Sequence, residues 1–302
     1  MKAWVLHGIS DMRLCDVPTP VAKESEVIVK VKAAGICSSD IPRVYSTGAY
    51  HYPIILGHEF SGITTNGKRV GVFPLLPCKT CESCNTGRYE TCLNYSYLGS
   101  RQNGAFAEYV VVPEWNLIEL PEDVSYEHAA LLEPAAVAVH AARQIDFNRV
   151  SNAAVIGNGI IGTLVVKWLA VFGITNLELI CRNDNSQQSY DVCVEAVGTT
   201  DAFRRCVEMT KANGQIVLVG NPNKEFCIDQ KLYWQILRKQ LTIKGSWNSR
   251  FPDDWKWVLD NTVRLKLDNL ITHKYPLDEV GNAFEMMHSR SEKHLKVMTV
   301  IE

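Results

Sequence analysis

The spacing of apolar and polar positions divides the chain into two parts. From residue 1 to about 113, short runs such as residues 26–31 alternate with a period of two, which is typical of strands that bury one face. From residue 153 onward, apolar strands at 191–195, 215–219 and 241–244 are separated by helix-like segments. Strands that alternate with helices indicate a parallel sheet built of βαβ units. The pattern therefore predicts an α/β protein, with a β-rich, partly barrel-like domain followed by a parallel-sheet domain.

Composition and charge narrow the class of protein. A chain of 302 residues with 46% hydrophobic and 21% charged residues is typical of a globular protein of one large or two modest domains, and the length favours two. The net charge of -2 supplies no basic field for phosphate backbones or anionic lipids, so nucleic acid and membrane partners are disfavoured. Residues 1–6 do not resemble a leader, and no apolar run approaches the roughly 20 residues of a spanning helix. We expect a cytoplasmic protein.

A glycine-rich segment opens the second part. The apolar strand at 153–156 runs into Gly157-Asn158-Gly159-Ile160-Ile161-Gly162, which leads directly into an amphipathic helix. In this strand-turn-helix context, Gly-x-Gly-x-x-Gly is the dinucleotide-binding fingerprint, because the glycines permit a tight turn and close approach of a pyrophosphate to the helix N-terminus. Gly157, Gly159, Ile160, Ile161 and Gly162 are therefore candidate cofactor-binding residues.

Four of the ten cysteines lie together in the chain. Cys78, Cys81, Cys84 and Cys92 follow the spacing Cys-x2-Cys-x2-Cys-x7-Cys, and four thiolates without an open position are the ligand set of a structural zinc ion. An iron-sulfur cluster could use similar spacing. The other cysteines are scattered in apolar surroundings, which suits metal binding in a reducing compartment better than disulfides. We expect a structural zinc lobe at 78–92 that is unstable without its metal.

Cys37 and His58 are candidate ligands of a second, catalytic zinc. A thiolate, a neutral imidazole and at most one more protein ligand leave a position open for water or a substrate oxygen. For a lone cysteine and a lone histidine, a small buried hydrophobe and a hydrogen-bonded core histidine would be the better interpretation. Here the two share one short stretch with Asp40 and Glu59, which favours the metal. Asp40 could accept a hydrogen bond from the far nitrogen of His58.

Glu133 is the candidate third ligand. It lies in the apolar segment 129–140, which Ser125 can cap as one helix, and burial of an unpaired carboxylate there would be costly. The alternative is that Glu133 lies at an exposed helix start beside Pro134. Glu59 is the competing carboxylate, either as a ligand or just behind the ligands.

These motifs, in this order, resemble the zinc-dependent medium-chain dehydrogenase/reductase family. The resemblance covers nearly the whole chain and rests on Cys37-Ser38-Ser39-Asp40, Gly57-His58-Glu59, the cysteine lobe, Glu133-Pro134 and the glycine fingerprint. Members that oxidise polyol phosphates also share segments at 42–43, 48–53, 56–62, 74–78, 98–101, 237–239 and 245–247. The family implies a GroES-like catalytic domain at 1–144 and 265–302, a Rossmann domain at 145–264, a catalytic zinc, hydride transfer to a nicotinamide, and a homodimer or homotetramer.

The resemblance also assigns roles to single residues. Ser39 matches the position of the family's proton-relay residue, the alternative being an ordinary turn serine. The acidic residue that binds the adenine ribose in NAD-preferring members falls here on Cys181, because Glu178 is too early and Asp184 is three residues late. A neutral Cys181 followed by Arg182 favours NADP. The alternative is that Arg182 only stacks on the adenine, which it could do with either cofactor.

The substrate implied by the resemblance is a secondary alcohol of a polyol or polyol phosphate. Arg43 and Arg101, both in loops, could bind a phosphate ester, although surface solvation explains each equally well. A free polyol such as sorbitol or iditol, or threonine, are alternative substrates. Outside enzymes, the alternative is an inactive zinc-binding paralogue.

Two connections are shorter than the family pattern requires. Only the eight residues 182–189 separate the strand that ends near Cys181 from the strand that starts near Tyr190, whereas a parallel crossover needs a dozen or more residues and usually a helix. A smaller shortfall lies at 63–67. We expect that a helix-strand-helix portion is missing from the middle of the nucleotide-binding sheet. Because such a loss would damage the core, we hypothesise that the natural chain carries residues at these points that the printed sequence lacks.

Overall fold

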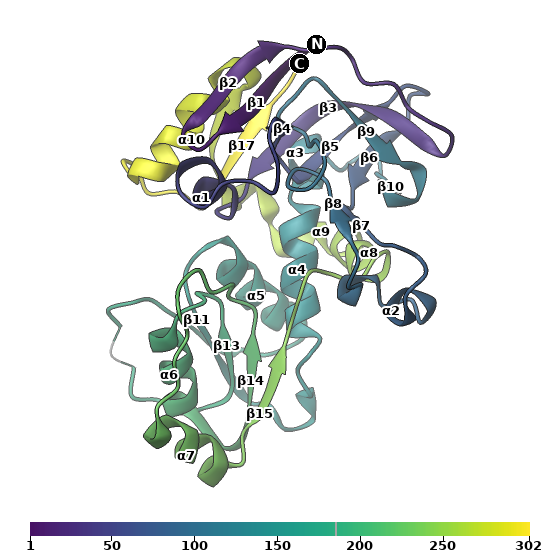
Figure 1. The fold of residues 1–302 in the computed structure, drawn as a ribbon. Helices are drawn as coiled ribbons and strands as arrows, with labels where there is room; N and C mark the ends of the chain where they lie inside the picture. Colours follow the sequence, from purple (N-terminus) through teal and green to yellow (C-terminus); the bar gives the residue numbers. More distant parts are fainter. Residues whose placement is uncertain (185) are drawn as a thin grey trace. The chain divides into compact units, whose positions relative to one another are not determined.

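The computed structural model describes residues 1–184 and 186–302. The chain forms two compact units, Met1–Glu133 with Arg250–Glu302, and Pro134–Ser249 (Figure 1). Antiparallel strands dominate the first unit and a parallel sheet with helices forms the second, which confirms the predicted α/β class. No helix in the described ranges is long and apolar enough to cross a bilayer.

A seven-stranded sheet forms the centre of the first unit. Its order is β10 (Leu117–Glu119), β6 (Arg69–Val72), β5 (Glu59–Thr64), β3 (Glu26–Ile36), β17 (Lys296–Val300) and β16 (Ile271–Pro276), with β9 (Tyr109–Pro113) also paired to β3. β3 is the central strand, because its 11 residues pair antiparallel with β5, β9 and β17. The last strand of the chain therefore pairs with an early one, and Thr299 lies opposite Ala34.

Smaller elements surround this sheet. Two further sheets contain β2 (Asp11–Asp16), β1 (Lys2–Gly8) and β4 (Ile54–Ile55), and β7 (Leu75–Leu76) with β8 (Ser96–Tyr97). The helices are α1 (Asp40–Tyr45), α2 (Glu82–Asn85), α3 (Tyr126–Ala130), α8 (Asp253–Asp260), α9 (Thr262–Leu265) and α10 (Val280–Ser289). The core of the unit includes Phe106 and Phe284, whose ring centroids lie 5.5 Å apart.

The single helix expected from Ser125 through residue 140 is in fact two helices. Ser125 Oγ caps α3 by accepting a hydrogen bond from His128 N at 3.2 Å, but α3 ends at Ala130, with Leu131 as its C-cap, and α4 spans Leu132–Ala142. Pro134 explains the break, because it has no N–H for the carbonyl four residues earlier and its ring clashes with that carbonyl. Glu133 consequently lies in the first turn of α4.

The second unit contains five parallel strands. Their order is β12 (Asn176–Ile180), β11 (Asn152–Ile156), β13 (Tyr190–Glu195), β14 (Thr210–Leu218) and β15 (Thr242–Gly245), with helices α5 (Ile160–Val171), α6 (Thr200–Met209) and α7 (Gln230–Lys239). Every residue of β11 is buried, as expected for an inner strand. The strand order reverses beside β11, and dinucleotides bind at such a point, outside the carboxyl ends of the strands.

The middle of this sheet is present, so the expected position of the gap is wrong, whereas the described residues between β12 and β13 do lack the expected helix-strand-helix portion. β12 and β13 both pair with β11, and the pairing continues through β14 to β15. In the dinucleotide-binding strand order 3-2-1-4-5-6, the strand that the described chain lacks would lie beyond β12, at the edge of the sheet. Loss of an edge strand leaves the core closed. At 63–67 the chain forms a hairpin turn in which Gly67 N donates to Thr64 O at 2.9 Å. Additional residues in the natural chain stay a prediction.

Candidate metal centres and cofactor site

The four cysteines of the predicted lobe lie around one point. Their sulfur–sulfur distances are 3.5 Å for Cys81–Cys84 and Cys78–Cys92, 3.8 Å for Cys81–Cys92 and 3.9 Å for Cys78–Cys84. Zn–S bonds of about 2.3 Å in a tetrahedron place the sulfurs roughly 3.8 Å apart, so this spacing fits one zinc ion. All four cysteines are free of disulfides. Hydrogen bonds, above all from the Thr80 hydroxyl, lower the pKa of Cys78 to about 6, which favours the thiolate that zinc binds.

An aromatic cluster fastens the lobe to the rest of its unit. The ring of Trp115 has Tyr89 edge-on at 4.9 Å and the Lys79 ammonium at 4.9 Å, both from the lobe. Its other neighbours include Phe251 at 5.2 Å, and Phe251 stacks on Phe73 at 4.7 Å. The lobe thus depends on its four thiolates for shape and on Trp115 for attachment.

Cys37, His58 and Glu59 form a second cluster, in which the ligand atoms all lie within 4.8 Å of one another. Cys37 directly follows β3 and His58 directly precedes β5, and the antiparallel register places Gly35 opposite Glu59. A Cβ at position 35 would lie 2.3 Å from Glu59 Oε2, so the glycine there leaves room for this carboxylate. Pairing of these two strands therefore builds the cluster.

Lys296 binds the carboxylate of Glu59 from the neighbouring strand β17. Its Nζ lies 2.5 Å from Glu59 Oε2 and donates to Ile36 O at 3.2 Å, and its side chain is 1% exposed. A lysine so deeply buried requires an anionic partner. Motif spacing does not reveal this residue; the one signal is a charged residue at the start of the apolar run 296–300.

Glu133 lies beside the same cluster. It is 8% exposed, so the alternative of an exposed helix start is wrong. Tyr97, which motif spacing also does not reveal, donates its hydroxyl to Glu133 Oε1 at 3.1 Å, and its ring lies edge-on to His58 at 5.7 Å. Burial raises the pKa of Glu133 to about 7; the charge of His58 opposes this rise and that of Glu59 adds to it. Glu133 is not one of the residues whose ligand atoms all lie within 4.8 Å of one another, but the charges of His58 and Glu59 in that cluster act on its pKa.

Asp40 lies behind His58, as expected. Its Oδ1 is 3.5 Å from His58 Nδ1, which is an ion-pair distance, and His58 Nδ1 has no hydrogen-bond partner among the described residues. Burial raises the pKa of Asp40, but His58, Arg43 and the amide of Cys37 outweigh it and hold that pKa below its ordinary value. Burial lowers the pKa of His58, but Asp40 and Cys37 raise it well above its ordinary value. Asp40 and Cys37 thus favour positive charge at this site. Together with the cysteine, histidine and carboxylate donors, this fits a divalent zinc ion.

Ser39 connects the cluster to Arg43, which lies in helix α1 and not in the loop expected for it. Its hydroxyl donates to Cys37 Sγ at 3.2 Å and accepts from Arg43 Nη1 at 2.9 Å. The same Nη1 donates to Ser39 O at 2.9 Å and to Asp40 Oδ1 at 3.1 Å. The guanidinium therefore fixes both the backbone and the hydroxyl of Ser39.

The glycine fingerprint forms the turn between β11 and α5. Gly157 has φ +116°, and a Cβ on Gly162 would lie 1.8 Å from Gly157 O, so both positions require glycine. Gly159 is the N-cap of α5, and a Cβ there would meet nothing within 4 Å. Ile160 and Ile161 begin the helix. The turn thus leaves open space before a helix N-terminus, which suits a pyrophosphate.

The turn after β12 contains the residues expected near the adenine ribose. Cys181 directly follows the strand, and Arg182 is exposed. Asp184, which strand counting places too late, folds back so that its Oδ2 accepts from Cys181 N at 2.6 Å. Glu178 is engaged elsewhere, because its Oε2 accepts from the Tyr190 hydroxyl and from Ser186 Oγ.

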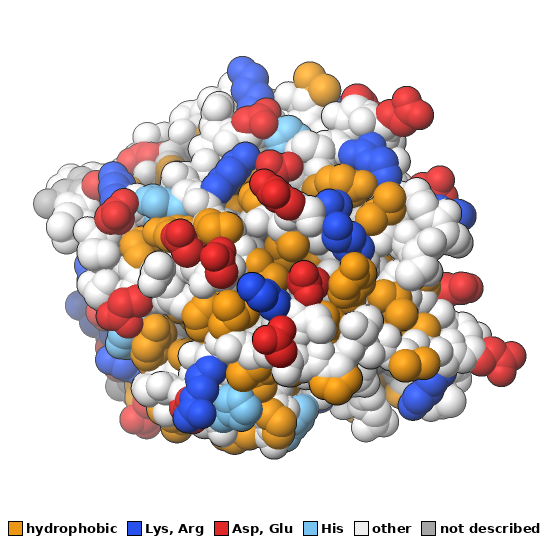
Figure 2. Space-filling model, turned by 90° about the horizontal axis from the view of Figure 1, so that it is seen from above, with side chains coloured by type: hydrophobic (Ala, Val, Ile, Leu, Met, Phe, Trp, Pro, Cys, Tyr) orange, Lys and Arg blue, Asp and Glu red, His pale blue; other side chains and the backbone are white. Residues whose placement is uncertain are grey.

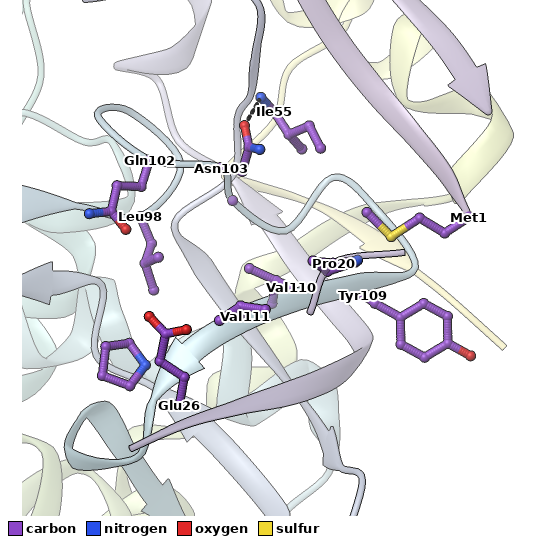
Figure 3. A pocket seen from close by; sticks show the side chains of 12 residues that line it. Met1, Pro20, Glu26, Ile55, Leu98, Gln102, Asn103, Tyr109, Val110 and Val111 are labelled. Atoms are coloured by element: carbon purple, nitrogen blue, oxygen red, sulfur yellow. Dashed lines mark hydrogen bonds between the residues drawn. The ribbon is translucent and has the colours of Figure 1, made fainter. Parts of the chain in front are cut away.

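A cavity of about 300 Å³ lies on the first unit, away from these residues. Figure 3 shows Met1, Glu26 and Tyr109 among its lining residues, and none of the predicted site residues lines it. Its position therefore gives no support for a role in the reaction. On the face drawn in Figure 2, acidic and basic side chains are interspersed and neither sign dominates.

Comparison with known proteins gives consistent matches. The chain matches the alcohol dehydrogenase GroES-like domain at residues 23–122 and the zinc-binding dehydrogenase domain at residues 171–264. It is 30% identical to galactitol 1-phosphate 5-dehydrogenase of Escherichia coli K12 over 329 aligned positions, which cover 94% of this chain and 95% of that protein. It is 27% identical to sorbitol dehydrogenase of Bacillus subtilis, with 99% and 96% covered. The crystal structure of galactitol-1-phosphate dehydrogenase from Escherichia coli superposes with a TM-score of 0.92 at 29% identity, covering 99% of this chain and 100% of that one.

Proposed function

The chain belongs to the zinc-containing alcohol dehydrogenases of the medium-chain dehydrogenase/reductase family, and we propose that its reaction is reversible oxidation of a secondary alcohol of a polyol phosphate by NADP. Zinc, NAD(P) and an alcohol or polyol substrate belong to the family; the phosphate ester and the preference for NADP are the finer proposal. The observation that carries the proposed alcohol oxidation is the cluster of Cys37, His58 and Glu59, with Glu133 beside it.

We assign Cys37, His58 and Glu133 as the protein ligands of the catalytic zinc, with Glu59 close by. Glu59 already has Lys296 as its counter-charge at 2.5 Å, whereas Glu133 accepts from the neutral Tyr97 hydroxyl and has no ion-pair partner in the described ranges. A metal would compensate the buried charge of Glu133. When bound, zinc supplies a Lewis acid that lowers the pKa of the substrate hydroxyl towards neutrality.

Ser39 transfers the proton, and Arg43 orients the Ser39 hydroxyl. In the oxidation, the O–H bond of the alcohol breaks and its proton passes to Ser39 Oγ, which releases its own proton to water. The carbinol C–H bond breaks, its hydride goes to the nicotinamide, and the C–O bond becomes a carbonyl. Arg43 cannot accept the proton, because a guanidinium stays protonated in proteins. Its role towards Ser39 is to orient the hydroxyl through the bond of 2.9 Å.

Arg43 is also our candidate for recognising the phosphate. Its side chain is 22% exposed, and all of its bonds to Ser39 and Asp40 use Nη1, which leaves Nη2 and Nε for a ligand. Arg101 is the poorer candidate, because it lies 4.7 Å and 4.4 Å from the ring centres of Tyr50 and Tyr95 and donates to Tyr95 O at 2.7 Å. The relative that is 30% identical and named for a polyol phosphate supports this choice.

NADP is proposed from the turn after β12. Cys181 is uncharged, and the exposed Arg182 forms no ion pair with any described residue, so its guanidinium is available for a 2′-phosphate. One oxygen of Asp184, the competing acid, is occupied by the amide of Cys181. An Arg182→Ala variant should lose more catalytic efficiency with NADP than with NAD. Equal losses with the two cofactors would count against the proposal.

A substrate panel tests the proposed function. We expect kcat/KM to be highest for galactitol 1-phosphate with NADP, when compared with galactitol, sorbitol, iditol and threonine with each cofactor. If threonine were the best substrate, the polyol assignment would be wrong. If the zinc-loaded protein oxidised none of these compounds, an inactive paralogue would be favoured.

Two matched variants separate phosphate recognition from general damage. Arg43→Met should reduce the ratio of kcat/KM for galactitol 1-phosphate to that for galactitol by about tenfold or more, because a charge-assisted bond to the phosphate is lost. Arg101→Met removes a guanidinium that aromatic rings already enclose and should leave this ratio within about twofold. The reverse result would assign the phosphate to Arg101.

The organisation of the protein follows the same family. We propose a catalytic domain at 1–144 and 265–302 and a Rossmann domain at 145–264, assembly as a homodimer or homotetramer, and a cytoplasmic location. Light scattering coupled to size-exclusion chromatography measures the oligomeric state, and a monomer at micromolar concentration would contradict the expected assembly.

A further inference from the structure

Arg205 holds the turn formed by residues 181–184, hereafter the ribose turn. It projects from α6, and its Nη1 donates to Cys181 O at 2.8 Å and to Arg182 O at 3.3 Å, while its Nη2 donates to Asp184 O at 2.7 Å. One guanidinium thus binds the carbonyls of three of the four residues in the turn. No motif in the sequence analysis points to this residue.

The ribose turn needs such a support because it lies at the edge of the sheet. Among the described residues, β12 has β11 as its only strand neighbour, and no helix lies in the nine-residue connection from β12 to β13. Beyond the turn, Ser186 Oγ and the Tyr190 hydroxyl both donate to Glu178 Oε2 and are hydrogen-bonded to each other, which fixes the connection to β12. Within the turn, the side-chain bonds to the backbone come from Arg205 and from Asp184, whose carboxylate accepts from Cys181 N.

We propose that Arg205 is a positioning residue for cofactor recognition, which fixes the ribose turn so that Arg182 and the backbone of Cys181 meet the adenosine end of the dinucleotide. The inference rests on the proposed function, since it takes this turn as the adenosine-binding element. By binding three carbonyls of the turn, Arg205 orients the peptide units of the turn and places a positive charge next to them. Both effects favour an anionic ribose substituent.

Arg204 provides a matched control one residue away on the same helix. Its Nη2 lies 2.7 Å from Asp229 Oδ2 in a pair whose side chains are 32% and 53% exposed, and among the described residues it forms no hydrogen bond with the ribose turn. Arg204→Met therefore removes the same side chain and the same charge from α6 while leaving the turn intact.

Calorimetric binding to the zinc-loaded protein tests the inference without turnover. The probes are 2′,5′-ADP and 5′-AMP, which carry only the adenosine end, and NADPH and NADH. In Arg205→Met we expect at least a tenfold rise in the Kd of whichever adenosine probe the wild type prefers and a rise in the cofactor KM, with kcat at saturating cofactor unchanged. Arg204→Met should stay within twofold of the wild type in each quantity.

The outcomes separate this inference from the proposed function. The wild-type preference between 2′,5′-ADP and 5′-AMP tests the NADP proposal, whereas the change caused by Arg205→Met tests the role of Arg205 whichever probe is preferred. Unchanged Kd values in a folded Arg205→Met protein would overturn the inference. If that variant does not fold, Arg205→Lys is the second variant, because an ammonium keeps the positive charge but cannot span the three carbonyls as the guanidinium does. It should still raise the Kd of the preferred adenosine probe by more than twofold, and a Kd within twofold of the wild type would again overturn the inference.

Discussion

Replacement of Lys296 by methionine tests how the buried charges behind the metal centre are balanced. The side chains of Lys296 and Glu59 are 1% and 2% exposed, and their charged atoms lie 2.5 Å apart. Removing one partner of a buried ion pair costs about 3–5 kcal/mol, because the other charge is left uncompensated in a medium that solvates it poorly. Methionine keeps most of the apolar stem of lysine, so Lys296→Met changes the charge much more than the packing.

Lys274→Met is the matched control on the neighbouring strand β16. Lys274 Nζ lies 3.0 Å from Glu127 Oε1, but the two side chains are 54% and 26% exposed. A solvent-exposed pair of this kind contributes about 0–1 kcal/mol. The two lysine variants therefore differ mainly in the burial of the partner that is left behind.

The assay is the free energy of opening of the first unit, from hydrogen exchange at the amides of β3 and β5 read by mass spectrometry. We expect Lys296→Met to lower it by about 3–5 kcal/mol in metal-free protein. With zinc bound the loss should be smaller, because the ion supplies positive charge close to Glu59. A loss in metal-free Lys296→Met no larger than that in Lys274→Met would refute this reasoning.

Three further predictions concern other parts of the molecule. Ser39→Ala should lower kcat by about 10²–10⁴-fold, as expected for loss of a general acid–base group, while cofactor Kd from calorimetry stays unchanged. Cys81→Ser should reduce bound zinc, measured by mass spectrometry of the metal, from two ions per chain to one and lower the thermal midpoint, whereas Cys15→Ser should do neither. Burial raises the pKa of Asp191, but Lys211 at 2.7 Å and the hydrogen bonds of Ser151 outweigh it and hold that pKa below its ordinary value. Because the pKa of Asp191 is depressed in the folded state, its ionised form stabilises the fold above about pH 4, and this contribution is lost as pH falls. Lys211→Met should therefore make the free energy of unfolding, measured with urea at a series of pH values, fall less steeply on the acid side. An unchanged acid-side slope would contradict this.

Short motifs account for what could be predicted from the sequence. Cys37, His58 and Glu59 could be identified because pairing of β3 with β5 converts two nearby motifs into one cluster. The cysteine lobe is likewise contained within a few turns of chain.

The partners that sequence reasoning missed come from distant or bent segments. Lys296 reaches Glu59 only because the last strand pairs with β3, and no periodicity states which strands pair. Asp184 was assigned a position by counting along an extended strand, whereas the turn after β12 folds it back onto Cys181 N. The predicted position of the gap in the middle of the sheet was wrong because the order of strands in space does not follow their order in the chain.

The most direct test of the central claim is the rate of NADP reduction by galactitol 1-phosphate before zinc removal, after removal with a chelator, and after zinc is restored. The proposed centre of Cys37, His58 and Glu133 predicts that the rate disappears with the metal and returns when the second zinc ion per chain has been added. An undiminished rate in protein shown by metal analysis to contain no zinc would contradict it.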